Sequence, residues 1–82
     1  MRSEFFSKVG LSDTEWEITP RLDEYGLPRL WFISGEEHRS LDLSAVRKVA
    51  KIMRENGQEK NADQLDDLIE TAKELSLRNI RR

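Results

Sequence analysis

The sequence predicts an α+β fold in which a small three-stranded antiparallel β-meander packs against a C-terminal antiparallel α-hairpin. Residues 44–76 carry apolar side chains at helical spacing, in two segments that a short polar loop separates. Residues 15–43 show short alternating or apolar runs, bounded by residues that favour turns. A short helix or arm is expected over residues 1–10 and a basic tail over residues 77–82. All 82 residues are expected to form one small domain with one core.

The two helical segments are each expected to bury one face. In the first segment the apolar residues recur three and four positions apart, at Val46, Val49, Ala50 and Met53. In the second segment the same spacing gives Leu65, Leu68, Ile69, Ala72 and Leu75. Gly57 ends the first helix naturally, because glycine enters the left-handed region without a Cβ penalty. Two one-sided helices with a short connection are expected to be antiparallel neighbours.

Three strands are expected in the first half of the chain. Apolar and polar residues alternate from Trp16 to Thr19, and Pro20 indicates an edge position or a bulge because it donates no backbone hydrogen bond. The strongest strand is 29–34, and the third is 38–43. The segments 23–28 and 34–37 have the composition of turns.

The central strand is apolar on both faces, which a helical pair on one side cannot explain. Because strand side chains alternate, Leu30 and Phe32 lie on one face while Trp31 and Ile33 lie on the other. The α-hairpin covers only one of these faces. The second face therefore needs another cover, and a tryptophan on it is typical of an interaction surface.

Two kinds of cover would satisfy this second face. In one, Phe5, Phe6 and Val9 fold over it within the same chain. In the other, it contacts a second copy of the protein or a protein partner. Trp16 and Ile18 would enlarge the patch if they paired beside the central strand on the same side. The candidate partner-binding residues are therefore Trp16, Ile18, Trp31 and Ile33.

Composition bounds the class of protein. The chain has 37% hydrophobic and 37% charged residues and no cysteine, which is typical of a soluble globular protein in a reducing compartment. No apolar run is long enough to span a membrane, and the N-terminus lacks the apolar segment of a signal peptide. A cytoplasmic location is therefore expected. The net charge of −2 is uneven, because residues 1–43 carry −4 and residues 44–82 carry +2.

No motif predicts catalysis, a metal site or cofactor binding, and no small-molecule substrate is evident. His38 is the only histidine, and its sequence neighbours point alternately to opposite faces of a strand, so they supply no catalytic or metal-binding set. The paired carboxylates fall in turns or on a helix face rather than across a cleft. We therefore expect that the protein is not an enzyme.

The main alternative is nucleic-acid binding through the basic face of the first helix. This stripe consists of Arg47, Lys48, Lys51 and Arg54. A helix-turn-helix protein reads DNA with its second helix, which is acidic here and would repel phosphates. The favoured hypothesis is a non-enzymatic protein–protein interaction module, such as a small accessory subunit, regulator or inhibitor, with self-association as one form of it.

Overall fold

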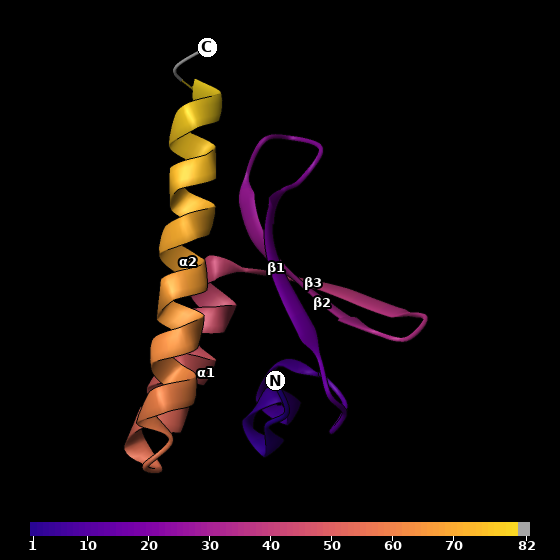
Figure 1. The fold of residues 1–82 in the computed structure, drawn as a ribbon, viewed down its shortest axis with the longest axis vertical. Coiled ribbons are helices and arrows are strands. Elements are labelled where there is room, and N and C mark those ends of the chain that lie inside the picture. The colour runs from indigo at the N-terminus through magenta and orange to yellow at the C-terminus, as the bar shows by residue number, and fades with distance from the viewer. Residues whose placement is uncertain (81–82) are drawn as a thin grey trace.

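The computed structural model describes residues 1–80 and confirms the α+β class. A 3-10 helix comes first, then three strands, then two α-helices (Figure 1). The elements are η1 (Glu4–Val9), β1 (Glu17–Leu22), β2 (Pro28–Ser34), β3 (Glu37–Asp42), α1 (Leu43–Glu55) and α2 (Glu59–Ile80). Both expected motifs are present, and no described helix is long and apolar enough to cross a membrane.

The sheet is an antiparallel meander in the order β1-β2-β3. Ile18 of β1 lies opposite Phe32 of β2, and Phe32 in turn lies opposite Arg39 of β3. The sheet is strongly twisted, so the β1–β2 hairpin runs beside α2 while the β2–β3 hairpin points away from the helices (Figure 1). β1 is an edge strand, which accommodates Pro20 as the sequence indicated.

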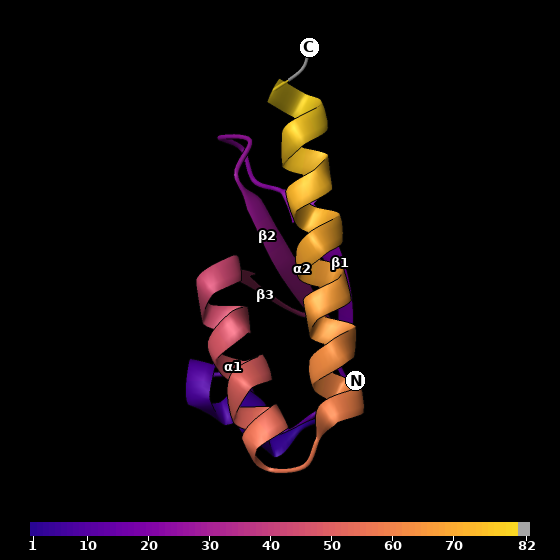
Figure 2. The ribbon, with the colours of Figure 1, turned by 90° about the vertical axis from the view of Figure 1, so that its left-hand side faces the viewer.

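The α-hairpin begins directly after β3. Asp42 caps α1 by accepting a hydrogen bond from the backbone N–H of Ala45 at 2.8 Å. Gly57, with φ of 81°, allows the reversal into α2. α2 has 22 residues and α1 has 13, so the C-terminal half of α2 extends beyond α1 and lies beside the β1–β2 hairpin (Figure 2).

The end of α2 corrects the boundary that the sequence indicated. The hairpin was expected to stop at residue 76 and to leave a tail over 77–82, whereas α2 continues through Ile80. Leu77 consequently lies on a helix, where 55% of its surface is exposed. Arg81 and Arg82, the last residues of the expected tail, lie outside the described residues.

The core lies between the sheet and the helices and contains three aromatic rings. Phe32 meets Phe6 edge to face at a centroid distance of 5.4 Å and Trp16 at 6.4 Å. The buried side chains are Phe6, Leu11, Trp16, Leu30, Phe32, Val46, Val49, Ala50, Met53, Ala62, Leu65, Ile69 and Ala72.

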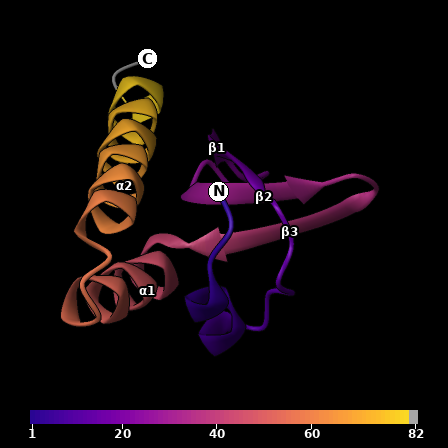
Figure 3. The same cartoon turned by 60° about the horizontal axis from the view of Figure 1, so that its bottom comes forward.

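The N-terminal segment does not cover the second sheet face, so the first of the two expected covers is wrong. η1 packs against α1 (Figure 3). Phe6 of η1 enters the core beside Phe32, which lies on the helix side of the sheet. Phe5 and Val9 pack against the same core. The physical reason is that α1 and β2 leave an apolar opening at this end of the core, and the N-terminal segment fills it.

Candidate functional site

The face of the sheet opposite the helices forms a grid of three rows across the three strands. We call it the outer face. Its rows follow from the strand register: Glu17, Ile33 and His38; Thr19, Trp31 and Ser40; Arg21, Arg29 and Asp42. Trp31 therefore lies at the centre, with charged residues concentrated in the two outer rows.

Trp31 and Ile33 lie outside the buried core. Both are half-buried, whereas Leu30 and Phe32 on the opposite face are almost fully buried by the helices. The indole Nε1 of Trp31 is enclosed and has no hydrogen-bond acceptor among residues 1–80. An enclosed donor without a partner costs about 1–3 kcal/mol, so Trp31 is not fully satisfied within the described chain.

Two arginines stand next to each other on the outer face. Arg21 and Arg29 are direct cross-strand partners, an arrangement that is unfavourable for like charges. Arg29 is held across the sheet, because Nε donates to Ser40 Oγ and Nη2 donates to the Ser40 carbonyl, both at 3.2 Å. Within the described part of the chain, neither guanidinium forms an ion pair.

Asp42 supplies negative charge at the end of the same row. Its carboxylate accepts hydrogen bonds from the backbone N–H of Ala45 and from Ser44 Oγ, and these bonds lower its pKa below the ordinary value. The nearby charges of Arg29 and Lys48 add to this effect. Asp42 is therefore ionised at neutral pH and remains exposed at the surface.

An open hollow adjoins Trp31 at the β1–β2 turn. Its volume is about 340 Å³, and its lining includes Arg29, Ser40 and Tyr25. Tyr25 has 80% of its surface exposed, the most of any large apolar side chain described. An aromatic side chain beside a hollow next to Trp31 is typical of sites that accept a partner's side chain.

Trp16 and Ile18 are not on the outer face, which corrects the expectation that they enlarge the Trp31 patch. Trp16 has no exposed surface, and its Nε1 donates to the Ser12 carbonyl at 3.0 Å. Ile18 lies opposite Phe32 and packs against the core. The reason is register: Ile18 pairs with an even-numbered residue of β2, and those residues point toward the helices.

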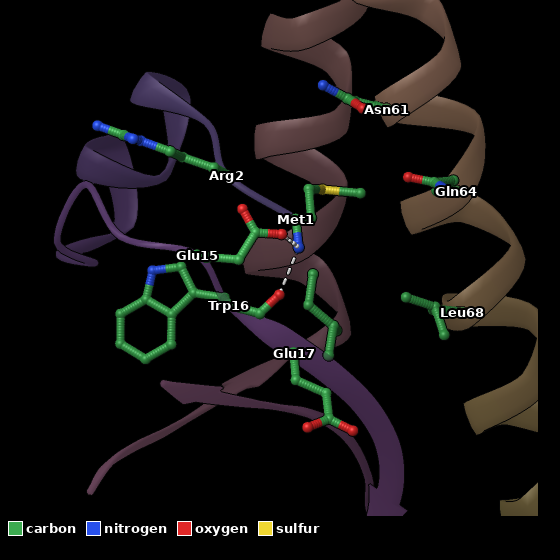
Figure 4. Close-up of a pocket in the computed structure, with 9 residues that line it drawn as sticks. Met1, Arg2, Glu15, Trp16, Glu17, Asn61, Gln64 and Leu68 are labelled. Atoms are coloured by element: carbon green, nitrogen blue, oxygen red, sulfur yellow. Dashed lines mark hydrogen bonds and ion pairs between the residues drawn. The ribbon is translucent and has the colours of Figure 1, made fainter. Parts of the chain in front are cut away.

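Trp16 and Ile18 instead border a groove between the start of β1 and α2. Trp16 turns its carbonyl toward Met1 there, whereas its buried indole points away from α2 (Figure 4). The groove has a volume of about 560 Å³, and α2 contributes Asn61, Gln64 and Leu68. On the side opposite α2, the N-terminal ammonium group of Met1 donates hydrogen bonds to Glu15 Oε1 at 2.9 Å and to the carbonyl of Trp16. The ammonium group and the Glu15 carboxylate compensate each other's charge, and Arg2 and Glu17 also line the groove. The α2 side offers the amide groups of Asn61 and Gln64 and the apolar side chain of Leu68.

One member of the basic stripe on α1 forms an ion pair with α2. Arg54 Nη2 lies 2.7 Å from Asp63 Oδ1 and 2.9 Å from Asp66 Oδ2. These bonds raise the pKa of Arg54, so it remains charged, but two carboxylates compensate its charge. The other members of the stripe remain exposed on the helix surface, and they are Arg47, Lys48 and Lys51.

The sequence did not identify the residues that surround Trp31. Arg21, Thr19 and Ser40 become its neighbours through strand pairing, so only a correct register could have found them. The lengths of the two turns are the signal that could have identified these neighbours, because they fix the register of each hairpin.

His38 lies in an outer row of the same face. No group of three potential metal ligands occurs among residues 1–80.

Comparison of the chain with protein-family models, with curated proteins and with solved structures finds no match. The functional argument therefore depends on the geometry of these surfaces.

Proposed function

We propose that the protein is a non-enzymatic protein–protein interaction module, and that the outer face is its contact surface. The observation that supports this proposal is the position of the N-terminal segment. Phe6 packs on the helix side, so the described chain leaves Trp31 and Ile33 without a covering element. A small accessory subunit, regulator or inhibitor is the class of protein that this surface fits.

The composition of the outer face supports the same proposal. The face has Trp31 at its centre and Arg29 held beside it, and tryptophan and arginine are enriched among the residues that contribute most binding energy at protein interfaces. The surrounding charged residues would form the polar rim of the contact. We place the interaction in the cytoplasm, as the cysteine-free composition led us to expect.

Nucleic-acid binding through α1 stays a weaker prediction. The ion pairs of Arg54 with Asp63 and Asp66 reduce the positive charge of the stripe. An electrophoretic mobility shift at two salt concentrations tests it, because binding to phosphates weakens steeply with salt. Changing Arg47 and Lys51 to Glu should abolish any such shift.

A photo-crosslinking amino acid at two matched positions tests the interaction proposal. Thr19 lies on the outer face beside Trp31, whereas Thr71 is exposed on α2. With p-benzoylphenylalanine at each position in living cells, we expect covalent adducts of a defined mass from position 19 and few from position 71. Equal yields at the two positions, or no adduct from position 19, would contradict the proposal.

A further inference from the structure

The charges of the outer face are arranged so that the face complements itself. On β1, Glu17 lies in one outer row and Arg21 in the other. On β3, His38 lies in the first of these rows and Asp42 in the other. On each edge strand, the carboxylate and its potential partner therefore lie in opposite outer rows. These residues are Glu17 and Arg21 on β1, and Asp42 and His38 on β3.

We propose that the outer face binds a second copy of this chain, related by a twofold axis that runs across the strands along the Thr19–Trp31–Ser40 row. This inference rests on the proposed function and names the partner. The axis reverses the order of the rows, so the two sheets pack face to face with antiparallel strands. The result is a six-stranded sandwich with an α-hairpin on each outside.

The twofold axis brings opposite charges together at each end. Glu17 meets Arg21 of the second copy, and Arg21 meets its Glu17. On the β3 strands, Asp42 meets His38, whose imidazole N–H can donate a hydrogen bond to a carboxylate. Arg21, which has no carboxylate partner within the described chain and faces Arg29 directly, gains one in the pair. The pairing thus offsets the unfavourable arginine neighbours of the single chain.

The apolar residues occupy the centre of the same arrangement. Trp31 lies on the axis and therefore packs against Trp31 of the second copy. Ile33 meets the aliphatic part of Arg29, whose guanidinium is already held by Ser40. A tryptophan pair surrounded by complementary charges has the anatomy of a protein interface, with an apolar centre and a polar rim.

A twofold axis parallel to the strands gives a poorer pairing. That axis keeps the rows in register and places β1 on β3, so Glu17 would meet His38 and Arg21 would meet Asp42. It also places β2 on β2, so Arg29 meets Arg29 of the second copy along the centre line. Like charges at an interface are costly, and this pair has no carboxylate opposite it. The axis across the strands leaves no like charges opposite each other, which is why we choose it.

The size of the face indicates a weak dimer. With about 4.8 Å between strands and about 6.8 Å between alternate residues, three rows on three strands cover roughly 14 by 20 Å. This is smaller than the interfaces of stable complexes, so we expect association at micromolar or higher concentration. Sedimentation velocity over a concentration series measures it.

Two charge reversals test the proposed pairing. Glu17→Arg places two arginines opposite each other in each pair, and Arg21→Glu places two glutamates there. Each variant alone should dimerise about tenfold more weakly than the original chain, because like charges replace opposite ones. An equimolar mixture of the two should recover dimers, because one variant then carries arginine at both positions and the other carries glutamate at both. The axis parallel to the strands would not give this recovery, because there the two positions do not face each other.

Matched controls carry the same charge changes on the helices. Glu74→Arg and Arg47→Glu alter exposed side chains of α2 and α1 and should dimerise like the original chain. Far-ultraviolet circular dichroism verifies that all four variants fold. Single variants that dimerise normally, or a mixture that recovers nothing, would overturn the twofold pairing.

The two proposals can fail separately. A chain that stays monomeric at every concentration, while position 19 crosslinks to a different protein, overturns self-pairing and leaves the interaction proposal standing. A monomeric chain with no crosslink from position 19 overturns both. A crosslinked adduct of twice the mass of the chain, together with the recovered dimer in the mixture, supports both.

Discussion

The two tryptophans of this chain show how one residue type serves two purposes. Trp16 is fully buried, packs edge to face on Phe32 and donates its indole N–H to the Ser12 carbonyl. Trp31 lies on the other face of the sheet, is half-buried and leaves its indole N–H without an acceptor in the described chain. Trp16 is thus a core residue, and Trp31 is available for contact.

Fluorescence quenching separates the two tryptophans. Trp16→Phe leaves Trp31 as the single reporter, and Trp31→Phe leaves Trp16. At a concentration low enough to keep the chain monomeric, acrylamide should quench Trp31 more strongly than Trp16, because Trp16 has 0% exposure. Circular dichroism checks that both variants are folded. Equal quenching constants would show that the outer face is covered in solution.

Leu65 and Leu68 are expected to differ in their contribution to stability, although both belong to the apolar stripe of α2. Leu65 has 0% exposure, whereas Leu68 is half-buried at the edge of the groove. Leu65→Ala should lower the free energy of unfolding by about 2–5 kcal/mol, because it leaves a cavity in the core. Urea denaturation measures the change. Leu68→Ala should cost less, and Asp67→Ala on the exposed face should change stability by about 0.5 kcal/mol or less.

At the scale of elements, Asp42 joins β3 to α1 and should make α1 sensitive to acid. Asp42→Ala removes the cap, and it should lower the free energy of unfolding by about 1 kcal/mol at neutral pH. Because the folded state lowers the pKa of Asp42, its contribution is present above the unfolded pKa and is lost as pH falls through the folded pKa. The difference in stability between the original chain and the variant should therefore narrow in acid.

Urea midpoints of the original chain and of the Asp42→Ala variant, measured at neutral pH and in acid, test this prediction. Asp42→Asn is the matched control, because asparagine caps helices well but does not titrate. The Asp42→Asn variant should retain most of the original chain's stability at neutral pH, and it should lose less stability in acid than the original chain does. If the stability difference between the original chain and the alanine variant grew as the pH fell, the assigned cap would be contradicted.

The helices and strands were predictable from the sequence, whereas the residues that become neighbours across the sheet were not. The stripe from Val46 to Met53 identifies α1, because helical periodicity is a local property of the chain. The face on which Trp16 and Ile18 lie depends on pairing with β2, and a shift by one residue reverses it. Arg29 was missed as a site residue for the same reason, since its contacts with the neighbouring strand are made across the sheet.

At the scale of the whole molecule, the position of the N-terminal segment determines whether the outer face of the sheet is covered. The sequence left open whether the N-terminal segment or another chain covers the outer face. The helices cover Leu30 and Phe32 but leave an opening at one end, and Phe6 closes it at 1% exposure. The molecule thus has one filled side and one open side, which is the condition for binding through the sheet.

Substituting Phe6 should therefore affect one tryptophan and not the other. Phe6→Leu keeps an apolar side chain in the core and should cost about 1–2 kcal/mol. In ¹H–¹⁵N spectra of the dilute chain, the indole resonance of Trp16 should move, because Phe6, Phe32 and Trp16 form one connected aromatic cluster. The indole resonance of Trp31, on the opposite face, should stay in place. Trp16→Phe and Trp31→Phe assign the two signals. If the Trp31 resonance moved while that of Trp16 did not, Phe6 would lie on the outer face and the sheet would have no free side.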